Sequence, residues 1–225
     1  MKKYFDVIAA SPLFSGIDKK DLQPMLACLS AQKKTYAKGE FLFTGGTVLP
    51  AVGMVLCGTV HIVKEDFWGH RALLGHAAEG ELFGEAYAAA AQPLTVSIQA
   101  AQDTQVLFMD IYKILTVCSA GCTFHTRLVH NFLAVLAQKN LMLNSKLQHM
   151  AQRTTREKLL SYLSAQSLHS ASAAFTIPYN RQQLADYLCV ERSAMSAALC
   201  ALRDEGLLTF RKNAFQLLSP AKNEK

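Results

Sequence analysis

Hydrophobic positions along the chain follow three different patterns, one after another. Residues 36–109 hold short β-prone runs separated by glycines, a pattern typical of a compact roll or barrel of short strands. Residues from about 122 to 150 hold apolar positions at helical spacing with no Gly or Pro between them, which predicts one long helix. Residues 180–218 hold two short helical patterns followed by two strand-like runs. A chain of 225 residues with these three parts is expected to form two domains joined by a helix.

The first part contains several clear strand patterns. The clearest are residues 41–43, 54–56, 60–63 and 106–109. Each is a short run of β-branched, aromatic or other apolar residues, and glycines or polar residues interrupt the chain between them. We therefore expect several short strands here rather than a few long ones.

The long helical segment carries a heptad pattern of apolar residues. Its a positions are Leu133, Asn140 and Leu147, and its d positions are Val129, Leu136, Leu143 and Met150. One polar Asn at an a position often fixes the register of parallel dimers, so the pattern predicts a dimer seam. The alternative is that this apolar face packs on its own domain.

The last part begins with a predicted helix-turn. Asn180 can cap a helix while Gln183, three residues later, reaches back to the cap amide, which is a capping box. Leu184 and Leu188 lie four residues apart and share one buried face. Ala185 is small enough to let a second helix cross closely, and a turn is expected at residues 189–190.

A second helix and a hairpin are predicted to follow. From Arg192 onward, Met195, Leu199 and Leu202 recur at helical spacing, and Gly206 stands where a left-handed C-terminal cap belongs. Residues 207–210 and 214–218 are short strand-like runs joined by the basic turn 211–213. This order predicts a helix-turn-helix followed by a two-stranded wing.

Both halves of the chain carry a family resemblance. The segments NRQQLADYL and ERSAMSAALCALRDEGLL resemble the winged helix of the Crp/Fnr family of bacterial transcription regulators. The segments KGEFLF, VLCGTVHIV and GELFGE are similar to the double-stranded β-helix of cyclic-nucleotide-binding domains, which is the effector sensor of that family. The chain departs from the helix-turn-helix pattern at Cys189, Glu191 and Ala197, where the family commonly has Gly, Ser or Asp, and a second Arg.

The resemblance implies an α+β fold in three parts. These are an N-terminal double-stranded β-helix (jelly-roll-like) sensor domain over residues 1–121, a dimerisation helix over 122–150 and a C-terminal winged helix-turn-helix domain over 151–225. The implied function is a homodimeric transcription regulator that binds an inverted repeat in double-stranded DNA under the control of a small-molecule effector. RNA polymerase is a further candidate partner.

Two other classes of function compete with this one. The first is a ligand-binding regulatory module that controls a protein partner, with the winged helix used as a protein-interaction surface. The second is an enzyme, which we do not expect because the sequence has no nucleophile–base arrangement, Gly-rich phosphate loop or metal-ligand pair.

The expected DNA-binding residues lie in and around the predicted helix-turn-helix. They are Asn180, Arg181, Arg192, Ser193, Ser196, Ala197, Arg211 and Lys212. Arg192 matches a base-contacting arginine of the family, and its guanidinium can donate two hydrogen bonds to guanine. The hydroxyls of Ser193 and Ser196 can add contacts, whereas Ala197 offers only a methyl group. Arg181, Arg211 and Lys212 are expected at phosphates, the alternative for each being a solvated surface charge.

The expected effector pocket lacks a cation. In cyclic-nucleotide-binding relatives, a Gly-Glu pair and a later Arg with a Ser or Thr hold the ribose and the cyclic phosphate. Gly84 and Glu85 are present, but the Arg position falls at Leu94, and no Lys or Arg occurs between residues 83 and 110. Thr95 can donate a hydrogen bond but supplies no charge, and Asn140 of the long helix completes the expected pocket. Enclosing a phosphate without a cation leaves its desolvation uncompensated, so we expect an effector other than cyclic AMP.

Charge and composition indicate which partners and sites this chain is expected to have. The formal net charge is +6, and residues 151–225 carry 10 Lys and Arg against 6 Asp and Glu, which suits a nucleic-acid-binding C-terminal part. The six cysteines are scattered without a C-x-x-C pair, so we expect reduced, mostly buried thiols rather than a zinc or disulfide site. No histidine pair has metal-ligand spacing, and no cofactor is expected. Without an apolar run of membrane-spanning length or a leader, we expect a cytoplasmic protein with no membrane partner.

Overall fold

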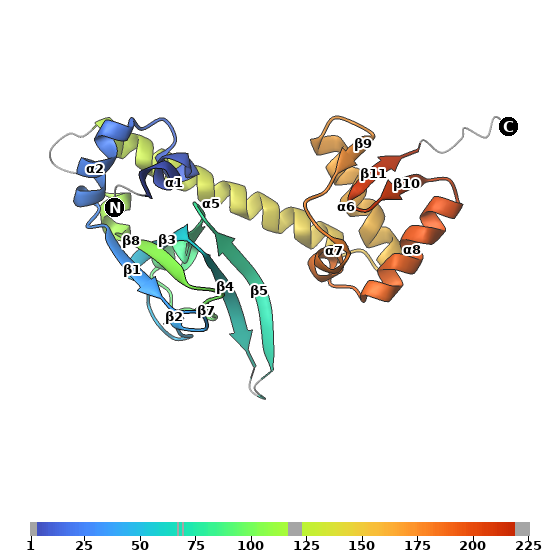
Figure 1. The fold of residues 1–225 in the computed structure, drawn as a ribbon, viewed down its shortest axis with the longest axis horizontal. Helices are drawn as coiled ribbons and strands as arrows, with labels where there is room; N and C mark the ends of the chain where they lie inside the picture. Colours follow the sequence, from blue (N-terminus) through green and yellow to red (C-terminus); the bar gives the residue numbers. More distant parts are fainter. Residues whose placement is uncertain (1–3, 67, 69, 117–122, 219–225) are drawn as a thin grey trace. The chain divides into compact units, whose positions relative to one another are not determined.

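A computed structural model describes residues 4–66, 68, 70–116 and 123–218 of the chain (Figure 1). The chain divides into two compact units, Met1–Gln138 and Lys139–Lys225. The division falls inside one long helix, so this helix contributes residues to both units. The boundaries that the sequence suggests at residues 121 and 150 stay predictions.

The first unit is built around two four-stranded antiparallel sheets. One has the order β1-β8-β3-β6 and the other the order β2-β7-β4-β5. The strands are β1 (Gln32–Tyr36), β2 (Phe41–Phe43), β3 (Ala51–Cys57), β4 (Thr59–Glu65), β5 (Arg71–Ala78), β6 (Leu82–Phe83), β7 (Ser97–Ala100) and β8 (Thr104–Asp110). These sheets contain all of the strands that the apolar runs predicted, and the expected β-rich N-terminal domain is confirmed.

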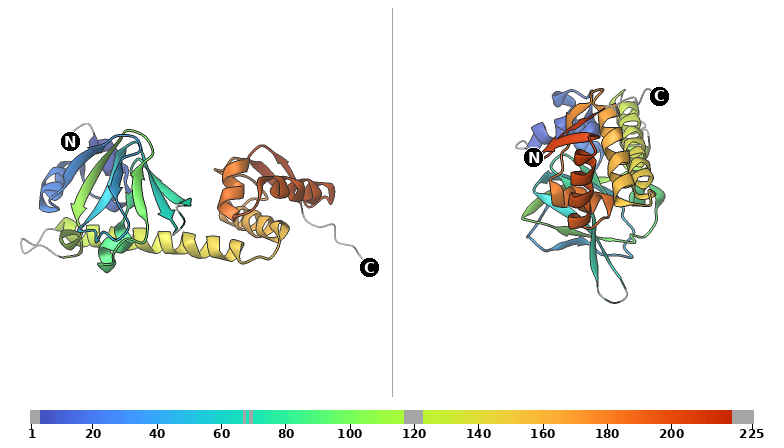
Figure 2. Two further views of the ribbon diagram at one scale, coloured as in Figure 1. Left: turned by 90° about the horizontal axis from the view of Figure 1, so that it is seen from below. Right: turned by 90° about the vertical axis from the view of Figure 1, so that its right-hand side faces the viewer.

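This unit also contains short helices. They are α1 (Phe5–Ala10), the 3-10 turn η2 (Pro12–Phe14), α2 (Lys19–Cys28), α3 (Glu85–Ala90) and α4 (Ile111–Leu115). The two sheets face each other in the ribbon views (Figure 2). Side chains from both fill one apolar core, to which Met54 contributes from β3 and Ile98 from β7. Within this core the ring of Phe83 lies so close to Gly53 that a β-carbon there would be 2.2 Å from it, which explains the glycine.

The long helix α5 (Thr123–Met150) confirms the helix that the sequence predicts. Its N-terminal half packs on the first unit, where Leu128 and Phe132 are fully buried. Polar side chains hold it there: Arg127 donates to the Gly16 carbonyl oxygen at 2.8 Å, and Asn131 donates to the Leu13 carbonyl oxygen at 2.9 Å. Neither α5 nor any other helix in the described part of the chain is long and apolar enough to cross a membrane.

The second unit confirms the predicted helix-turn-helix and wing. After α6 (Thr155–His169), it contains β9 (Ala174–Thr176), α7 (Arg181–Leu188), α8 (Arg192–Asp204), β10 (Leu208–Arg211) and β11 (Ala214–Leu217). The two wing strands form a sheet with β9, in the order β10-β11-β9. The three-residue strand β9 carries too short a pattern to be predicted; it is held by pairing with β11 and by stacking of Phe175 on Phe215.

The cysteines correct one expectation from the sequence. Cys57, Cys189 and Cys200 are exposed and Cys28 is half-buried, whereas buried core thiols were expected. The exposed three stand at a strand end, in a turn and on the outer face of a helix, outside the apolar periodicity that directs side chains inward. Cys118 and Cys122 lie outside the described residues.

A buried histidine holds the last turn of α5 against α6. The ring nitrogens of His149 lie 2.8 Å from the Ser161 hydroxyl and 3.3 Å from the Ser145 hydroxyl, and the ring meets Tyr162 edge-on. Burial lowers the pKa of His149 below its ordinary value of 6.5, so the folded unit favours the neutral ring.

We expect this histidine to make the second unit less stable in mild acid. Because the unfolded chain takes up the proton first, His149 contributes stability above pH 6.5 that is lost as the pH falls toward its lowered pKa. Urea unfolding at a series of pH values should show this slope in the wild type, and His149→Gln should flatten it. Equal slopes for the two proteins would contradict the prediction.

Candidate nucleic-acid interface and effector pocket

Local capping fixes the first helix of the helix-turn-helix. The Asn180 side chain accepts a hydrogen bond from the Gln183 amide at 2.9 Å, and the Gln183 side chain accepts one from the Asn180 amide at 2.9 Å. Leu184, Ala185 and Leu188 are fully buried, as their spacing predicts. The helix ends at Leu188, and the next residue, Cys189, adopts a left-handed φ of 51° that glycine takes more easily. The predicted start and turn are therefore confirmed, and the Asn180 oxygen is engaged within the protein.

A carboxylate caps the second helix, α8. The side chain of Glu191 accepts hydrogen bonds from the amides of Ser193 at 2.7 Å and Ala194 at 3.2 Å, and from the Ser193 hydroxyl. The Ser193 hydroxyl and then these amides hold the pKa of Glu191 below its ordinary value. Glu191 therefore caps the helix as Ser or Asp would at this position. Its carboxylate occupies the backbone amides at the start of the helix, where an external anion could otherwise bind.

The expected base-contacting residues lie on α8. Met195, Leu199 and Leu202 bury one face of it, whereas Arg192 and Ala197 are exposed and Ser196 is half-buried. The Ser196 hydroxyl donates to the Arg192 carbonyl oxygen at 2.9 Å. Within the part of the chain that the structure describes, the Arg192 guanidinium makes no hydrogen bond or ion pair. It is therefore available to an external acceptor.

The wing ends in a basic turn that is anchored to the domain. Lys212 adopts a left-handed φ of 55° between β10 and β11. The next residue, Asn213, donates through its side chain to the Ile177 carbonyl oxygen at 3.0 Å and accepts from the Ile177 amide at 2.9 Å. Arg211 and Lys212 are both exposed. The turn therefore offers two cations on a fixed backbone.

Arg181 has a different environment from the one expected. Its guanidinium lies 4.7 Å from the centre of the Phe210 ring and 5.2 Å from that of Phe215. It is half-buried, and this burial lowers its pKa. The side chain thus joins α7 to the wing through cation–π contacts, and its contact with a phosphate stays a prediction. Arg203, which sequence reasoning did not single out, lies 6.0 Å from the same Phe210 ring.

In the first unit, Gly84 and Glu85 begin helix α3. Gly84 has a left-handed φ of 75°, and a β-carbon there would lie 2.6 Å from the end of the Leu49 side chain, so the backbone conformation favours glycine here for reasons of fold. Glu85 is buried with 6 % of its surface exposed. Thr95 is exposed, and its hydroxyl lies 2.6 Å from the Tyr87 hydroxyl.

Leu94 lies in the apolar core of the roll. Only 3 % of its surface is exposed, and its backbone amide donates to the Thr47 carbonyl oxygen at 2.9 Å. The buried polar and charged residues that the structure describes in this unit are Ser11, Glu85, Thr104 and His125, and none of them is a Lys or Arg. The described interior therefore contains no permanent cation to meet a phosphate.

The remaining predicted pocket residue, Asn140, belongs to the second compact unit. It is exposed on α5, and its side-chain oxygen accepts a hydrogen bond from Asn144 at 2.9 Å. The structure therefore brings Gly84, Glu85, Leu94 and Thr95 into one unit and Asn140 into the other.

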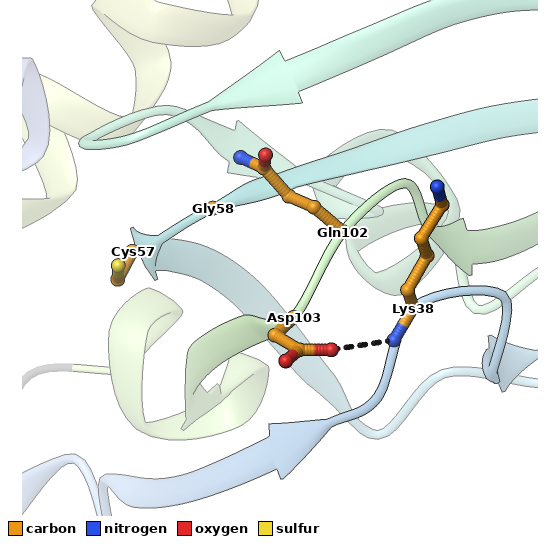
Figure 3. Close-up of a pocket in the computed structure, with 5 residues that line it drawn as sticks. All are labelled: Lys38, Cys57, Gly58, Gln102 and Asp103. Atoms are coloured by element: carbon orange, nitrogen blue, oxygen red, sulfur yellow. Dashed lines mark hydrogen bonds between the residues drawn. The ribbon is translucent and has the colours of Figure 1, made fainter.

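Two surface depressions of the first unit are lined by other residues. One, of about 490 Å³, is lined by Lys38, Cys57, Gly58, Gln102 and Asp103. There the Asp103 carboxylate accepts from the Lys38 backbone amide at 2.9 Å, while the Lys38 ammonium end points away from it (Figure 3). The other, of about 560 Å³, lies between the first helices and the 79–81 turn. Among the residues that the structure describes, no three His, Cys, Asp or Glu side chains are grouped to hold a metal ion.

Comparison with known proteins matches both units. Residues 33–120 match the family model of the cyclic nucleotide-binding domain, and residues 157–222 match that of the Crp-like helix-turn-helix domain. The cyclic AMP receptor protein of Thermus thermophilus is 26 % identical over 203 residues, which cover 88 % of this chain and 88 % of that protein.

Solved structures share the fold at low sequence identity. CprK in complex with OCPA is 15 % identical with a TM-score of 0.65, over 88 % of each chain. The c-di-GMP-responsive global regulator CLP of Xanthomonas campestris is 17 % identical with a TM-score of 0.57, over 90 % of this chain and 100 % of that one. The Thermus thermophilus catabolite activator protein is 24 % identical with a TM-score of 0.50, over 92 % and 94 %. At these identities the likeness establishes the fold alone.

Proposed function

Because this chain belongs to the Crp/Fnr family of DNA-binding transcription regulators, we propose that it binds an inverted-repeat DNA site as a homodimer and responds to a small molecule other than cyclic AMP or cyclic GMP. Regulators of this family act by binding rather than by catalysis. A bacterial regulator acts where the chromosome lies, so we assign it to the cytoplasm. RNA polymerase is the further partner that such a role implies.

The observation that carries DNA binding is the exposed Arg192 on α8 together with the anchored basic wing. A guanidinium without an internal partner can donate two parallel hydrogen bonds to O6 and N7 of guanine. Arg211 and Lys212 supply the phosphate contacts that set the orientation of such a helix but carry no sequence information.

The exposed leucines of α5 support the homodimer. Leu133, Leu143 and Leu147 belong to the predicted heptads, and 57 %, 61 % and 61 % of their surfaces are exposed. Packing two such helices together removes this apolar area from water, at about 25 cal/mol per Å². Leu136, a d residue, is partly buried on the first unit. Part of the apolar face of α5 therefore packs on its own domain. We propose the dimer seam for the heptad positions that remain exposed.

Asn140 offers a test of this seam. We expect Asn140→Leu to raise the melting temperature, because it replaces a polar a residue by an apolar one, while loosening the unique register of the dimer. Thermal unfolding at several protein concentrations measures the first effect, and cross-linking of cysteines placed along α5 measures the second. An unchanged or lower melting temperature would mean that the seam lies on another face of the helix.

The proposal for the effector rests on the interior of the roll. Leu94 is packed in its core, and no described Lys or Arg is buried there, so a cyclic phosphate gains no ion pair on entry. The names of three relatives given above mention different small molecules, namely cyclic AMP, c-di-GMP and OCPA. Proteins with this fold therefore need not share a ligand.

Two titrations test the proposed function. Fluorescence anisotropy of a labelled inverted repeat should show binding that weakens as the salt concentration rises, because bound phosphates release counterions. Isothermal titration with cyclic AMP and cyclic GMP should show no saturable binding with a dissociation constant below about 100 µM. Such a constant would correspond to a binding free energy of more than about 5 kcal/mol. Absence of DNA binding would favour a module that acts on a protein partner, and tight cyclic AMP binding would overturn the effector proposal.

A further inference from the structure

The recognition helix α8 presents few hydrogen-bonding groups to a major groove. The Ser193 hydroxyl donates to the Glu191 carboxylate, and the Ser196 hydroxyl donates to the Arg192 carbonyl oxygen at 2.9 Å. Near the other end of the helix, Arg203 and Asp204 pair with each other at 2.8 Å. Among the described residues of α8, Arg192 is therefore the cationic side chain that has no such internal partner.

Between these ends the exposed face of α8 carries three alanines beside the exposed Cys200. Ala194, Ala197 and Ala201 are all exposed, and their spacing of three and four residues aligns them on one side of the helix. This side lies away from Met195 and Leu199, which are buried. The helix thus has large apolar side chains toward its own domain and methyl groups toward solvent.

We infer that Ala197 makes this protein select thymine at a fixed distance from the guanine that Arg192 reads, an inference that rests on the DNA binding by α8 proposed above. Thymine is the base that carries a methyl group in the major groove, and an alanine methyl contacts it favourably. Ala197 follows Arg192 by five residues, which is about 7.5 Å along a helix. At 3.4 Å per base pair, this rise corresponds to about two base pairs, and because five residues also turn the helix by about 140°, Ala197 faces a different base from the guanine that Arg192 reads.

The other bases fit this face less well. A methyl group placed against the exocyclic amine of cytosine or adenine, or against the carbonyl oxygen of guanine, removes water from a polar group without replacing its hydrogen bond. In relatives that carry a second arginine at the position of Ala197, a guanidinium can satisfy guanine instead. The departure from the family pattern at residue 197 is therefore expected to change the base that is read there.

Selection from a random duplex library, followed by substitution in the best site, tests the inference on the unmodified protein. Each thymine of a half-site is replaced in turn by deoxyuridine, which lacks only the methyl group. We expect about fourfold weaker binding at one position, about two base pairs from the selected guanine, the value expected for one buried methyl group. The other thymines serve as internal controls.

Two variants assign the effect to residue 197. Ala197→Gly should remove the difference between thymine and deoxyuridine at that position, and Ala197→Arg should shift the selected base from thymine to guanine. Arg192→Ala should weaken binding but keep the thymine-to-deoxyuridine ratio. Equal affinity for deoxyuridine at every position would overturn this inference alone, whereas a wild-type protein that binds no DNA would overturn the proposed function and this inference with it.

Discussion

Replacement of Leu94 by arginine is expected to lower the free energy of unfolding of the first unit by about 3 to 5 kcal/mol, the range for an unpaired charge in a protein interior. Leu94 is 3 % exposed in the core, and the structure describes no buried acid in this unit besides Glu85. The substitution would place an arginine where the resemblance to cyclic-nucleotide-binding domains predicts one. Because this roll is packed around an apolar side chain, we expect destabilisation rather than a gain of cyclic AMP binding.

Chemical denaturation followed by circular dichroism measures this loss. Leu94→Met is the matched control, because it keeps the apolar character and most of the volume and is expected to change the unfolding free energy by less than about 1.5 kcal/mol. If Leu94→Arg is as stable as the wild type and binds cyclic AMP, then the roll retains a working phosphate site and our account of its interior is wrong.

Replacement of Arg192 by alanine is expected to weaken binding to the selected DNA site by about 1 to 3 kcal/mol, or about 5- to 150-fold, and to relax the preference at one base pair of each half-site. The physical reason is the loss of a bidentate contact from a guanidinium that has no internal partner among the described residues. Competition binding against a panel of single-base variants measures both the affinity and the preference.

Lys212 provides the matched control for Arg192. Its ammonium group lies on the exposed turn of the wing, so Lys212→Ala should weaken all sequences alike and reduce the slope of affinity against salt concentration by about one unit. Neither substitution removes a buried side chain, so both variants are expected to fold. If both change the sequence preference equally, the division between a base reader and a phosphate contact is wrong.

The sequence by itself determined the elements of the fold whose causes are local. The capping box of Asn180 and Gln183, the apolar spacing in α7 and α8, and the left-handed Gly206 place the helix-turn-helix, because each depends on residues a few positions apart. The same holds for the uninterrupted helix α5 and for the short strands of the roll. The exposed Arg192 and the basic turn of the wing also follow from this local pattern.

Only the tertiary structure decided which partners the polar and apolar side chains find. Arg181 stacks on two rings of the wing, and Leu94 enters a core built from both sheets. These contacts join residues far apart in the sequence. Strand β9 likewise exists because β11 pairs with it. Local periodicity sets the direction of a side chain from its own helix or strand, but what it meets there depends on segments that only folding brings together.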